Sequence, residues 1–299
     1  MKRSPMLALL LLVMTACAAT FCIGVYAGYA RAWPLSRLKI LVANHLGDPD
    51  IQTDRFGRLR RYPGKNEIAC PLQDEATAVL LVAGQSNAAN AQGQRYESPD
   101  DRVVNFFEGR CYRAASPLLG ADGRRGESWT LLGTKLVRAG LYNSVILVPA
   151  AVGGSPIRRW VAGGDLSTML TEVIRATKGR YTITGVLWDQ GATDFALRTP
   201  EDRYRSELKS LIDQVRAEGV TAPFFITRCS VGGEGWTEDN PIARAQAALA
   251  DGKTIFDGPN TDHDVTPFDR YDGYHFSASG QEKWTDTWVQ LLQAHGRAK

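Results

Sequence analysis

A serine that follows a long apolar run is the first candidate for chemistry in this 299-residue chain. Ser86 stands in the segment Gly84-Gln85-Ser86-Asn87, directly after the run at residues 79–83. A Val- and Leu-rich run of this kind is typical of a strand buried on both faces of a parallel sheet. Gly84 permits a sharp turn, so Ser86 is expected at the carboxyl edge of the sheet, where such sheets bind ligands. Ser86 is thus a candidate nucleophile, and the alternative is a turn former or helix N-cap.

A histidine near the end of the chain is the candidate base. His275 lies three residues after Asp272, and Gly273 between them allows a tight bend. A carboxylate at this spacing can accept the imidazole N–H and orient the ring, so that the other ring nitrogen takes a proton from a serine. The alternative is a histidine that serves only on the surface or in packing.

Hydrogen-bond donors that could stabilise a developing negative charge lie directly after two further predicted strands. Backbone N–H groups of the pair Gly153-Gly154 can point together toward a ligand, and the side-chain amide of Gln190 offers another donor. Donors fixed in this way stabilise an oxyanion. The alternatives are an ordinary turn and a polar residue in a surface loop. Of the two nearby carboxylates, we expect Asp189 in solvent and Asp194 at a helix cap.

These segments need a framework that brings them together, and the chain from residue 77 onward supplies one. Strands and helices alternate, which predicts a parallel sheet with helices on both faces. For the first helix we expect Ser128 as the N-cap and Gly140 as the stop. The predicted strands cover residues 79–83, 103–107, 145–149, 183–188 and 224–226, and the predicted helices cover 128–139, 166–176, 199–218, 240–250 and 277–294.

The joint order of the motifs resembles a known superfamily. Gly-Gln-Ser-Asn, Gly-Gly-Ser, Trp-Asp-Gln-Gly and Asp-Gly-Tyr-His-Phe-Ser follow one another as in SGNH hydrolases, most like the sialate O-acetylesterase and carbohydrate esterase family 6 branch. The resemblance covers about residues 77–295. It implies an α/β fold, a three-layer α/β/α flavodoxin-like sandwich with a central parallel sheet, and neither metal nor cofactor. It also implies that Ser86 is the nucleophile, His275 the base and Asp272 its orienting partner.

The resemblance extends to the oxyanion donors, with one departure. It implies that the donors are the backbone N–H groups of Ser86 and of Gly154 or Gly153, together with the Gln190 amide. Ala192 stands where the branch usually has a glutamate after Gln-Gly. No member of the triad is lost, but the substitution bears on rate and substrate range.

We therefore expect a serine esterase that removes O-acetyl groups from a carbohydrate of the sialate or xylan type. One alternative is a polysaccharide O-acetyltransferase, in which a sugar hydroxyl instead of water resolves the acetyl-enzyme. Another is a carbohydrate-binding protein with a decayed site, which Ala192 favours. Arg158, Arg159 and Trp160 follow the Gly-Gly turn. They could contact sugar hydroxyls or an acidic glycan, or form a helix start packed on the surface.

The beginning of the chain indicates a membrane segment. Residues 6–30 carry no charge, and this length is enough to cross a hydrocarbon core of about 30 Å. Lys2 and Arg3 precede it, which favours an inside amino terminus. We expect an anchor or signal over residues 1–31 and an extracytoplasmic domain, in the periplasm or at the cell surface. The alternative is a lipidated Cys17.

The remaining sequence sets the domain organisation. Residues 32–75 are rich in Pro and charged residues, which predicts a linker, and residues 76–299 form the predicted esterase domain. A net charge of +3 without basic blocks gives no support for nucleic-acid binding, and no metal-ligand spacing occurs. In an extracytoplasmic domain Cys70 and Cys111 could pair; the alternative is that both, like Cys229, are unpaired thiols.

Overall fold

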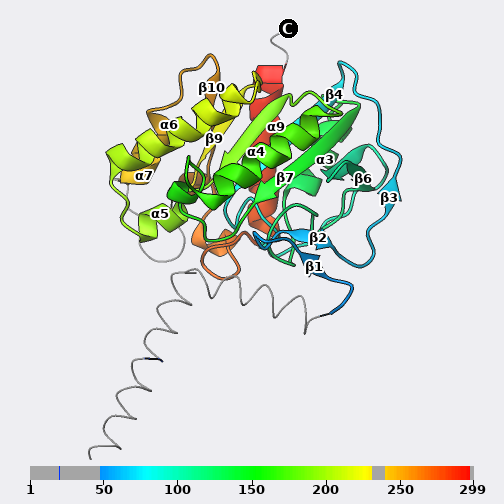
Figure 1. Ribbon diagram of the computed structural model, residues 1–299, viewed down its shortest axis with the longest axis horizontal. Coiled ribbons are helices and arrows are strands. Elements are labelled where there is room, and N and C mark those ends of the chain that lie inside the picture. The colour runs from blue at the N-terminus through cyan, green and yellow to red at the C-terminus, as the bar shows by residue number, and fades with distance from the viewer. Residues whose placement is uncertain (1–19, 21–47, 231–239, 297–299) are drawn as a thin grey trace, which may run out of the picture.

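An eight-stranded sheet organises the residues that the computed structural model describes, which are 20, 48–230 and 240–296 (Figure 1). The strand order is β10-β9-β8-β4-β7-β5-β6-β3, parallel from β10 to β5 and antiparallel for β5-β6 and β6-β3. The strands are β3 (Glu67–Ile68), β4 (Thr77–Gly84), β5 (Val103–Phe107), β6 (Arg110–Arg113), β7 (Ser144–Ala151), β8 (Gly185–Asp189), β9 (Phe224–Arg228) and β10 (Ile255–Asn260).

Strand β4 lies at the centre of the sheet, and all eight of its residues are buried. Its side chains alternate between two cores, with Leu81 in the core on one face and Leu80 in the core on the other. Because both faces are covered, the strand reads as an uninterrupted apolar run. Gly84 at its end pairs with Ala151 of β7 and Asp189 of β8, so three strands end at the same level.

Helices cover both faces of the sheet. Helices α4, α6 and α7 pack on one face, and α3 and α9 pack on the other, where Trp129 and Trp284 meet with ring centroids 4.8 Å apart. Figure 1 shows α4 and α6 in front of the sheet and α9 behind it. The helices are α3 (Trp129–Arg138), α4 (Asp165–Lys178), α5 (Ala192–Ala196), α6 (Glu201–Ala217), α7 (Pro241–Ala247), α8 (Thr261–Asp264) and α9 (Ala278–Gly296), with 3₁₀ turns η1 (Ile157–Arg159) and η2 (Pro267–Asp269).

The five predicted strands and five predicted helices are present, but the sheet is not wholly parallel as predicted. Strand β6 runs antiparallel because it returns from β5 through a two-residue turn in which Glu108 and Gly109 both have positive φ. Strand β10 was not predicted either. It contains Gly258 and Pro259, which break a strand pattern, and its register shifts there at the edge of the sheet.

The start of α3 also differs from the prediction. Ser128 occupies the N-cap position, but its side chain makes no capping hydrogen bond. The buried carboxylate of Glu127 accepts the Thr130 N–H at 2.9 Å instead. At the other end the prediction is confirmed, because Gly140 with φ +66° directly follows the C-cap residue.

Part of the stretch that we expected to be a linker carries regular structure. From residue 48 onward the hairpin of β1 (Gln52–Thr53) and β2 (Leu59–Arg61) forms, and β3 joins the main sheet beside β6. Leu59 is fully buried, and its N–H donates to the Ala121 carbonyl at 2.9 Å. This part of the chain is therefore packed against the domain.

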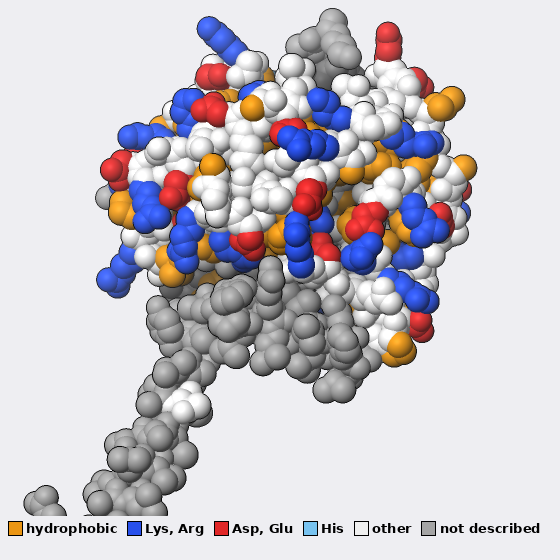
Figure 2. All heavy atoms as spheres, viewed as in Figure 1, with side chains coloured by type: hydrophobic (Ala, Val, Ile, Leu, Met, Phe, Trp, Pro, Cys, Tyr) orange, Lys and Arg blue, Asp and Glu red, His pale blue; other side chains and the backbone are white. Residues whose placement is uncertain are grey.

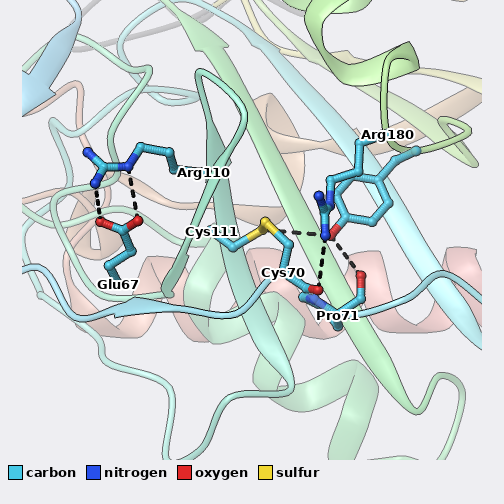
Figure 3. Close-up of a disulfide and its surroundings, with 7 residues drawn as sticks. Glu67, Cys70, Pro71, Arg110, Cys111 and Arg180 are labelled. Carbon is cyan, nitrogen blue, oxygen red and sulfur yellow. Dashed lines mark hydrogen bonds and ion pairs between the residues drawn. A yellow bond between two sulfur atoms is a disulfide. The ribbon is translucent and has the colours of Figure 1, made fainter.

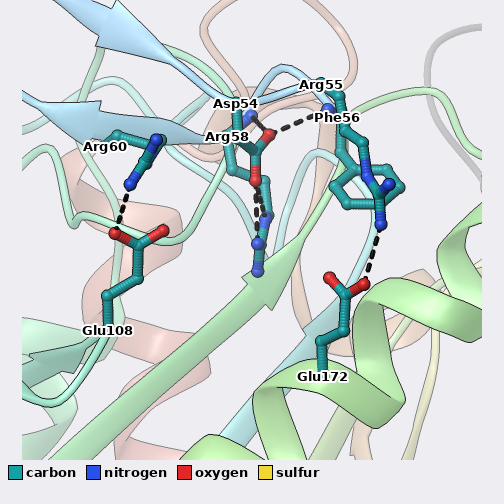
Figure 4. A network of polar contacts seen from close by, with 7 residues as sticks. All are labelled: Asp54, Arg55, Phe56, Arg58, Arg60, Glu108 and Glu172. Carbon is teal, nitrogen blue, oxygen red and sulfur yellow. Dashed lines mark hydrogen bonds and ion pairs between the residues drawn. The ribbon is translucent and has the colours of Figure 1, made fainter.

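Ion pairs connect the hairpin of β1 and β2 to its surroundings (Figure 4). Arg55 reaches Glu172 on α4 at 2.7 Å, and Arg60 reaches Glu108 in the β5-β6 turn at 2.8 Å. Both of these pairs are exposed, so each contributes little stability. Within the hairpin, Arg58 pairs with the Asp54 carboxylate at 2.8 Å; the Arg58 side chain is buried and that of Asp54 is 12% exposed.

A disulfide joins Cys70 to Cys111 of β6 (Figure 3). Around it, Arg180 donates to the Cys70 carbonyl and Tyr181 donates to the Pro71 carbonyl at 2.9 Å. The disulfide confirms the first of the two alternatives drawn from the sequence, and it fastens the segment before β4 to the antiparallel end of the sheet. Among the described cysteines, Cys229 alone is free.

None of the helices in the described ranges has the length and apolar character needed to cross a membrane. The predicted anchor at residues 1–31 lies, apart from Thr20, outside the described residues.

The disulfide gives the first testable prediction. Replacing Cys70 and Cys111 together by Ser should lower the free energy of unfolding by about 3–4 kcal/mol, because the bond closes a loop in the unfolded chain. The sequence separation of 41 residues sets this size. Urea unfolding measures it. Reductant should lower the stability of the wild-type chain to that of the double variant and should not change the stability of the variant. If the wild-type chain has the same free energy of unfolding as the variant and reductant does not change it, the prediction is wrong.

Candidate active site

The turn that carries Ser86 is set by a backbone contact at the end of β4. Gly84 has φ +140°, and a Cβ placed there would lie 1.9 Å from the Asp189 carbonyl oxygen, so only glycine fits. The next N–H, that of Gln85, donates to the same oxygen at 2.9 Å. The chain thus leaves the sheet sharply, and Ser86 is half-buried in the following turn. None of the described residues accepts a hydrogen bond from its N–H.

The buried side chain of Gln85 joins this turn to the loop after β8. Its Oε1 accepts the N–H of Thr193 at 3.2 Å and the N–H of Gly191 at 3.4 Å. The position of Ser86 is therefore coupled to the loop that carries Gln190.

Asp272 and His275 meet as the sequence predicted. The His275 Nδ1 lies 2.7 Å from Asp272 Oδ2, and Asp272 Oδ1 accepts the N–H groups of His275 at 2.8 Å and Tyr274 at 3.0 Å. Partial burial acts to raise the pKa of the Asp272 carboxyl, but the hydrogen bonds from His275 and Tyr274 outweigh it and hold the pKa below its usual value. Asp272 is therefore ionised at neutral pH and can orient the imidazole.

One buried glutamine ties the loop of His275 to the turn of Ser86. The Gln92 amide nitrogen donates to the Asn87 carbonyl at 2.9 Å, and its Oε1 accepts the Phe276 N–H at 2.7 Å. The residue after Ser86 and the residue after His275 are thus bound to the same fully buried side chain. Sequence reasoning missed Gln92, because nothing in its own neighbourhood marks it as a bridge.

The Gly-Gly turn lies beside the nucleophile turn, since the Val152 N–H donates to the Gly84 carbonyl at 3.0 Å. The Gly153 N–H donates to the Asp122 carboxylate at 3.2 Å. Gly154, with φ +60°, is half-buried, and its N–H donates to no residue in the described ranges. Of the two predicted donors, Gly154 has the available N–H.

Gln190 has a different position from the one that we expected. It is fully buried, and its amide nitrogen donates to the Ser155 carbonyl at 3.1 Å and to Asp194 Oδ2 at 2.5 Å. Its Oε1 accepts the Tyr204 hydroxyl at 2.8 Å. Both amide hydrogens are therefore used inside the protein, and in this arrangement Gln190 holds the Gly-Gly turn and offers no hydrogen to a ligand.

Asp194 acts across the fold and does not cap its own helix. Its Oδ2 accepts the Ile157 N–H at the start of η1 at 2.8 Å, and its Oδ1 accepts the Thr199 hydroxyl at 2.8 Å. The carboxylate thus satisfies the first N–H of a turn that follows a different strand.

Asp189, expected in solvent, is fully buried. As the last residue of β8 it lies between β4 and β9, and no described residue hydrogen-bonds to either carboxyl oxygen. Burial raises the pKa of Asp189 to about 7; the Cys229 thiol and Arg270 act in the opposite direction, and Asp262 raises it slightly. Near neutral pH this carboxyl is therefore partly protonated.

The residues after the Gly-Gly turn divide into packing and surface residues. Trp160 is fully buried, donates to the Ser155 hydroxyl at 3.0 Å and packs edge-on against Trp188, so it cannot contact a sugar. Arg159 pairs with Asp165 at 2.8 Å. Arg158 is exposed.

With this geometry in hand, comparison with known proteins identifies the family. The model of the family described as carbohydrate esterase, sialic acid-specific acetylesterase, matches residues 76–290. The chain belongs to this family. It is therefore an ester hydrolase of the carbohydrate esterase class. No curated protein sequence matches the chain significantly.

Solved structures show the same fold. A protein from Arabidopsis thaliana is 17% identical with a TM-score of 0.61, covering 73% of this chain and 98% of its own. NanS is 17% identical with a TM-score of 0.53, covering 77% of this chain and 100% of its own. At this level of identity the likeness shows the fold alone, an SGNH-like α/β fold around a mostly parallel sheet.

The buried carboxyl of Asp189 predicts a pH dependence of stability. The unfolded chain releases this proton near the ordinary pKa of 3.8, whereas the folded chain retains it up to about pH 7. The contribution of this group to the free energy of unfolding is therefore fully present below about pH 4. It falls as the pH rises to 7, by at most about 1.4 kcal/mol per pH unit. Asp189→Asn, which cannot ionise, should flatten the fall.

Urea unfolding of both chains at pH 4 to 8 measures the effect. The readout is the slope of stability against pH, since a constant cost of placing an amide there does not alter it. Equal slopes for the two chains would contradict the burial of an ionisable group at this position.

Proposed function

We propose that this chain removes O-acetyl groups from a carbohydrate, with Ser86 as nucleophile, His275 as base and Asp272 as its orienting partner. The observation that carries the proposal is the 2.7 Å contact between His275 and Asp272, in a loop that Gln92 ties to the residue after Ser86. Membership of a carbohydrate esterase family supplies the reaction class.

The first half of the reaction forms an acetyl-enzyme. With Nδ1–H donated to Asp272, the His275 Nε2 accepts the proton of the Ser86 hydroxyl while its oxygen attacks the acetyl carbonyl carbon. The ionised Asp272 stabilises the imidazolium. As the tetrahedral intermediate collapses, the C–O bond to the sugar breaks and the imidazolium returns its proton to the sugar oxygen.

The second half returns the enzyme to its starting state. His275 takes a proton from water, the hydroxide attacks the acetyl carbon, and acetate leaves as the proton passes to Ser86. In both halves the oxyanion is stabilised by the N–H groups of Ser86 and Gly154, each worth about 3–4 kcal/mol. Gln190 supports the Gly154 donor through its hydrogen bond to the carbonyl of the next residue, Ser155.

The cysteines support a cellular location for this activity. Disulfides persist in oxidising compartments, so the Cys70–Cys111 bond supports a location outside the cytoplasm. We propose that residues 1–31 anchor the enzyme to a membrane with its esterase domain in the periplasm or at the cell surface.

Substitution of the triad tests the proposal. Ser86→Ala and His275→Ala should each lower kcat by at least about 10³-fold, since nucleophile and base are removed. Asp272→Asn should lower kcat by roughly 10²–10⁴-fold, because the ring loses its orienting charge. Release of acetate from O-acetylated sialoglycans and from acetylated xylan measures the rates.

Two variants of the same kind serve as controls. His263→Ala removes an imidazole that is 80% exposed, and Ser167→Ala removes a hydroxyl on α4 that bonds to Gln214. Both should retain the wild-type rate on either substrate. Triad variants that work as fast as these controls would end the proposal.

A further inference from the structure

Three exposed arginines lie beside the candidate site. They are Arg95, Arg124 and Arg125, and none of them forms an ion pair with an acidic residue in the described ranges. Elsewhere on the surface basic and acidic side chains are interspersed, as Figure 2 shows for the face in view, and many pair as Arg60 does with Glu108. Single exposed arginines without an ion pair to a described residue also occur elsewhere, as at Arg138 in the last turn of α3, but here three such guanidinium groups lie on adjacent loops.

Arg125 is connected to the candidate base through one aromatic ring. Its guanidinium lies 5.1 Å from the centre of the Tyr271 ring, and that ring stacks on the His275 imidazole with centroids 6.0 Å apart. The Tyr271 hydroxyl donates to the Ala91 carbonyl at 2.8 Å, which fixes the ring. A cation is thus held one ring away from the imidazole.

Two further arginines adjoin Arg125. Arg95 donates to the Arg124 carbonyl at 2.6 Å and to the Tyr62 hydroxyl at 3.1 Å. Its guanidinium lies 5.8 Å from the centre of the Tyr62 ring. We call Tyr271, Arg125, Arg124, Arg95 and Tyr62 the arginine strip.

The backbone beneath the strip belongs to the loops that carry the candidate site. The Arg125 N–H donates to the Asn90 carbonyl at 3.0 Å, and Gly126 and Gln92 exchange two backbone hydrogen bonds. Gln92 is the residue that joins the turn of Ser86 to the loop of His275. Strip and site are therefore held in a fixed relation.

Two carboxylates beside the strip already have partners. Asp122 accepts the N–H groups of Gly123 and Gly153, and Asp272 accepts His275. Because the three arginines are exposed and form no ion pair with a described residue, their positive charge is open to a ligand. Guanidinium groups bind carboxylates through paired hydrogen bonds, and tyrosine rings present flat apolar faces beside them.

We propose that the arginine strip binds carboxylate groups of an acidic oligosaccharide whose acetylated residue lies at Ser86. Three guanidinium groups in series offer more than one carboxylate site, which favours an oligosaccharide over a single sugar. The inference rests on the proposed function and deepens it by naming the neighbours of the acetylated sugar.

Binding to a chain that cannot react tests the strip. Full-length Ser86→Ala should bind oligogalacturonate, a carboxylated probe, and bind neutral xylo-oligosaccharide of equal length at least about 10-fold more weakly. Adding Arg125→Gln or Arg95→Gln should weaken oligogalacturonate binding about 10-fold and leave xylo-oligosaccharide binding unaltered. Added salt should weaken the binding of oligogalacturonate and leave that of xylo-oligosaccharide unchanged.

Arg138→Gln in the same background is the matched control. Arg138 is exposed and forms no ion pair with a described residue, but it lies at the end of α3, close to where β7 begins, on the opposite edge of the sheet. The Arg138→Gln variant should bind both probes as tightly as Ser86→Ala does. The proposal is wrong if Ser86→Ala has equal affinity for the two probes, or if Arg138→Gln and Arg125→Gln lose equal affinity for oligogalacturonate. Acetate release by the wild-type chain, measured in parallel, reports on the esterase proposal alone.

Discussion

The close approach of the backbone at Gly84 to the Asp189 carbonyl is the constraint on which the site depends. It leaves no room for a side chain at the end of β4, and it lets the chain turn out of the sheet beside β8. Because β4 pairs in register with both β7 and β8, the turn of Ser86, the Gly-Gly turn and the loop of Gln190 all begin at one level. Residues far apart in sequence thus reach one edge of the sheet without long connecting loops.

Three neutral amides hold these loops to one another, together with the carboxylates of Asp122 and Asp194. Gln85 joins the turn after β4 to the loop after β8, Gln92 joins the loops of Ser86 and His275, and Gln190 joins its own loop to the Gly-Gly turn. An amide both donates and accepts, so one buried side chain can satisfy two backbone groups without the cost of burying a charge. This network does not require a carboxylate at position 192, where Ala192 begins α5.

Local patterns made much of this predictable. The apolar runs gave the central strands, and the three-residue spacing of Asp272 and His275 gave their contact, since both lie in one bend. The bridging role of Gln92 and the burial of Asp189 depend on residues far along the chain, which a sequence window does not contain. Gln190 was expected to face a ligand because it follows a strand, but Asp194 and Tyr204 enclose it. A residue that follows a strand can therefore be placed near the edge of the sheet from the sequence, but the direction in which its side chain points cannot be predicted in this way.

The amino-terminal segment contributes to the site more than its composition suggests. Leu59 in β2 exchanges hydrogen bonds with Gly120 and Ala121, and the next residue, Asp122, donates its N–H to the Ala151 carbonyl at the end of β7. The carboxylate of Asp122 then accepts the Gly153 N–H, which fixes the turn that presents Gly154. A continuous set of hydrogen bonds thus runs from β2 to the turn of Gly154, the proposed oxyanion donor. Because Tyr62, one residue after β2, ends the arginine strip, the same segment supports both the proposed chemistry and the proposed recognition of acidic sugars.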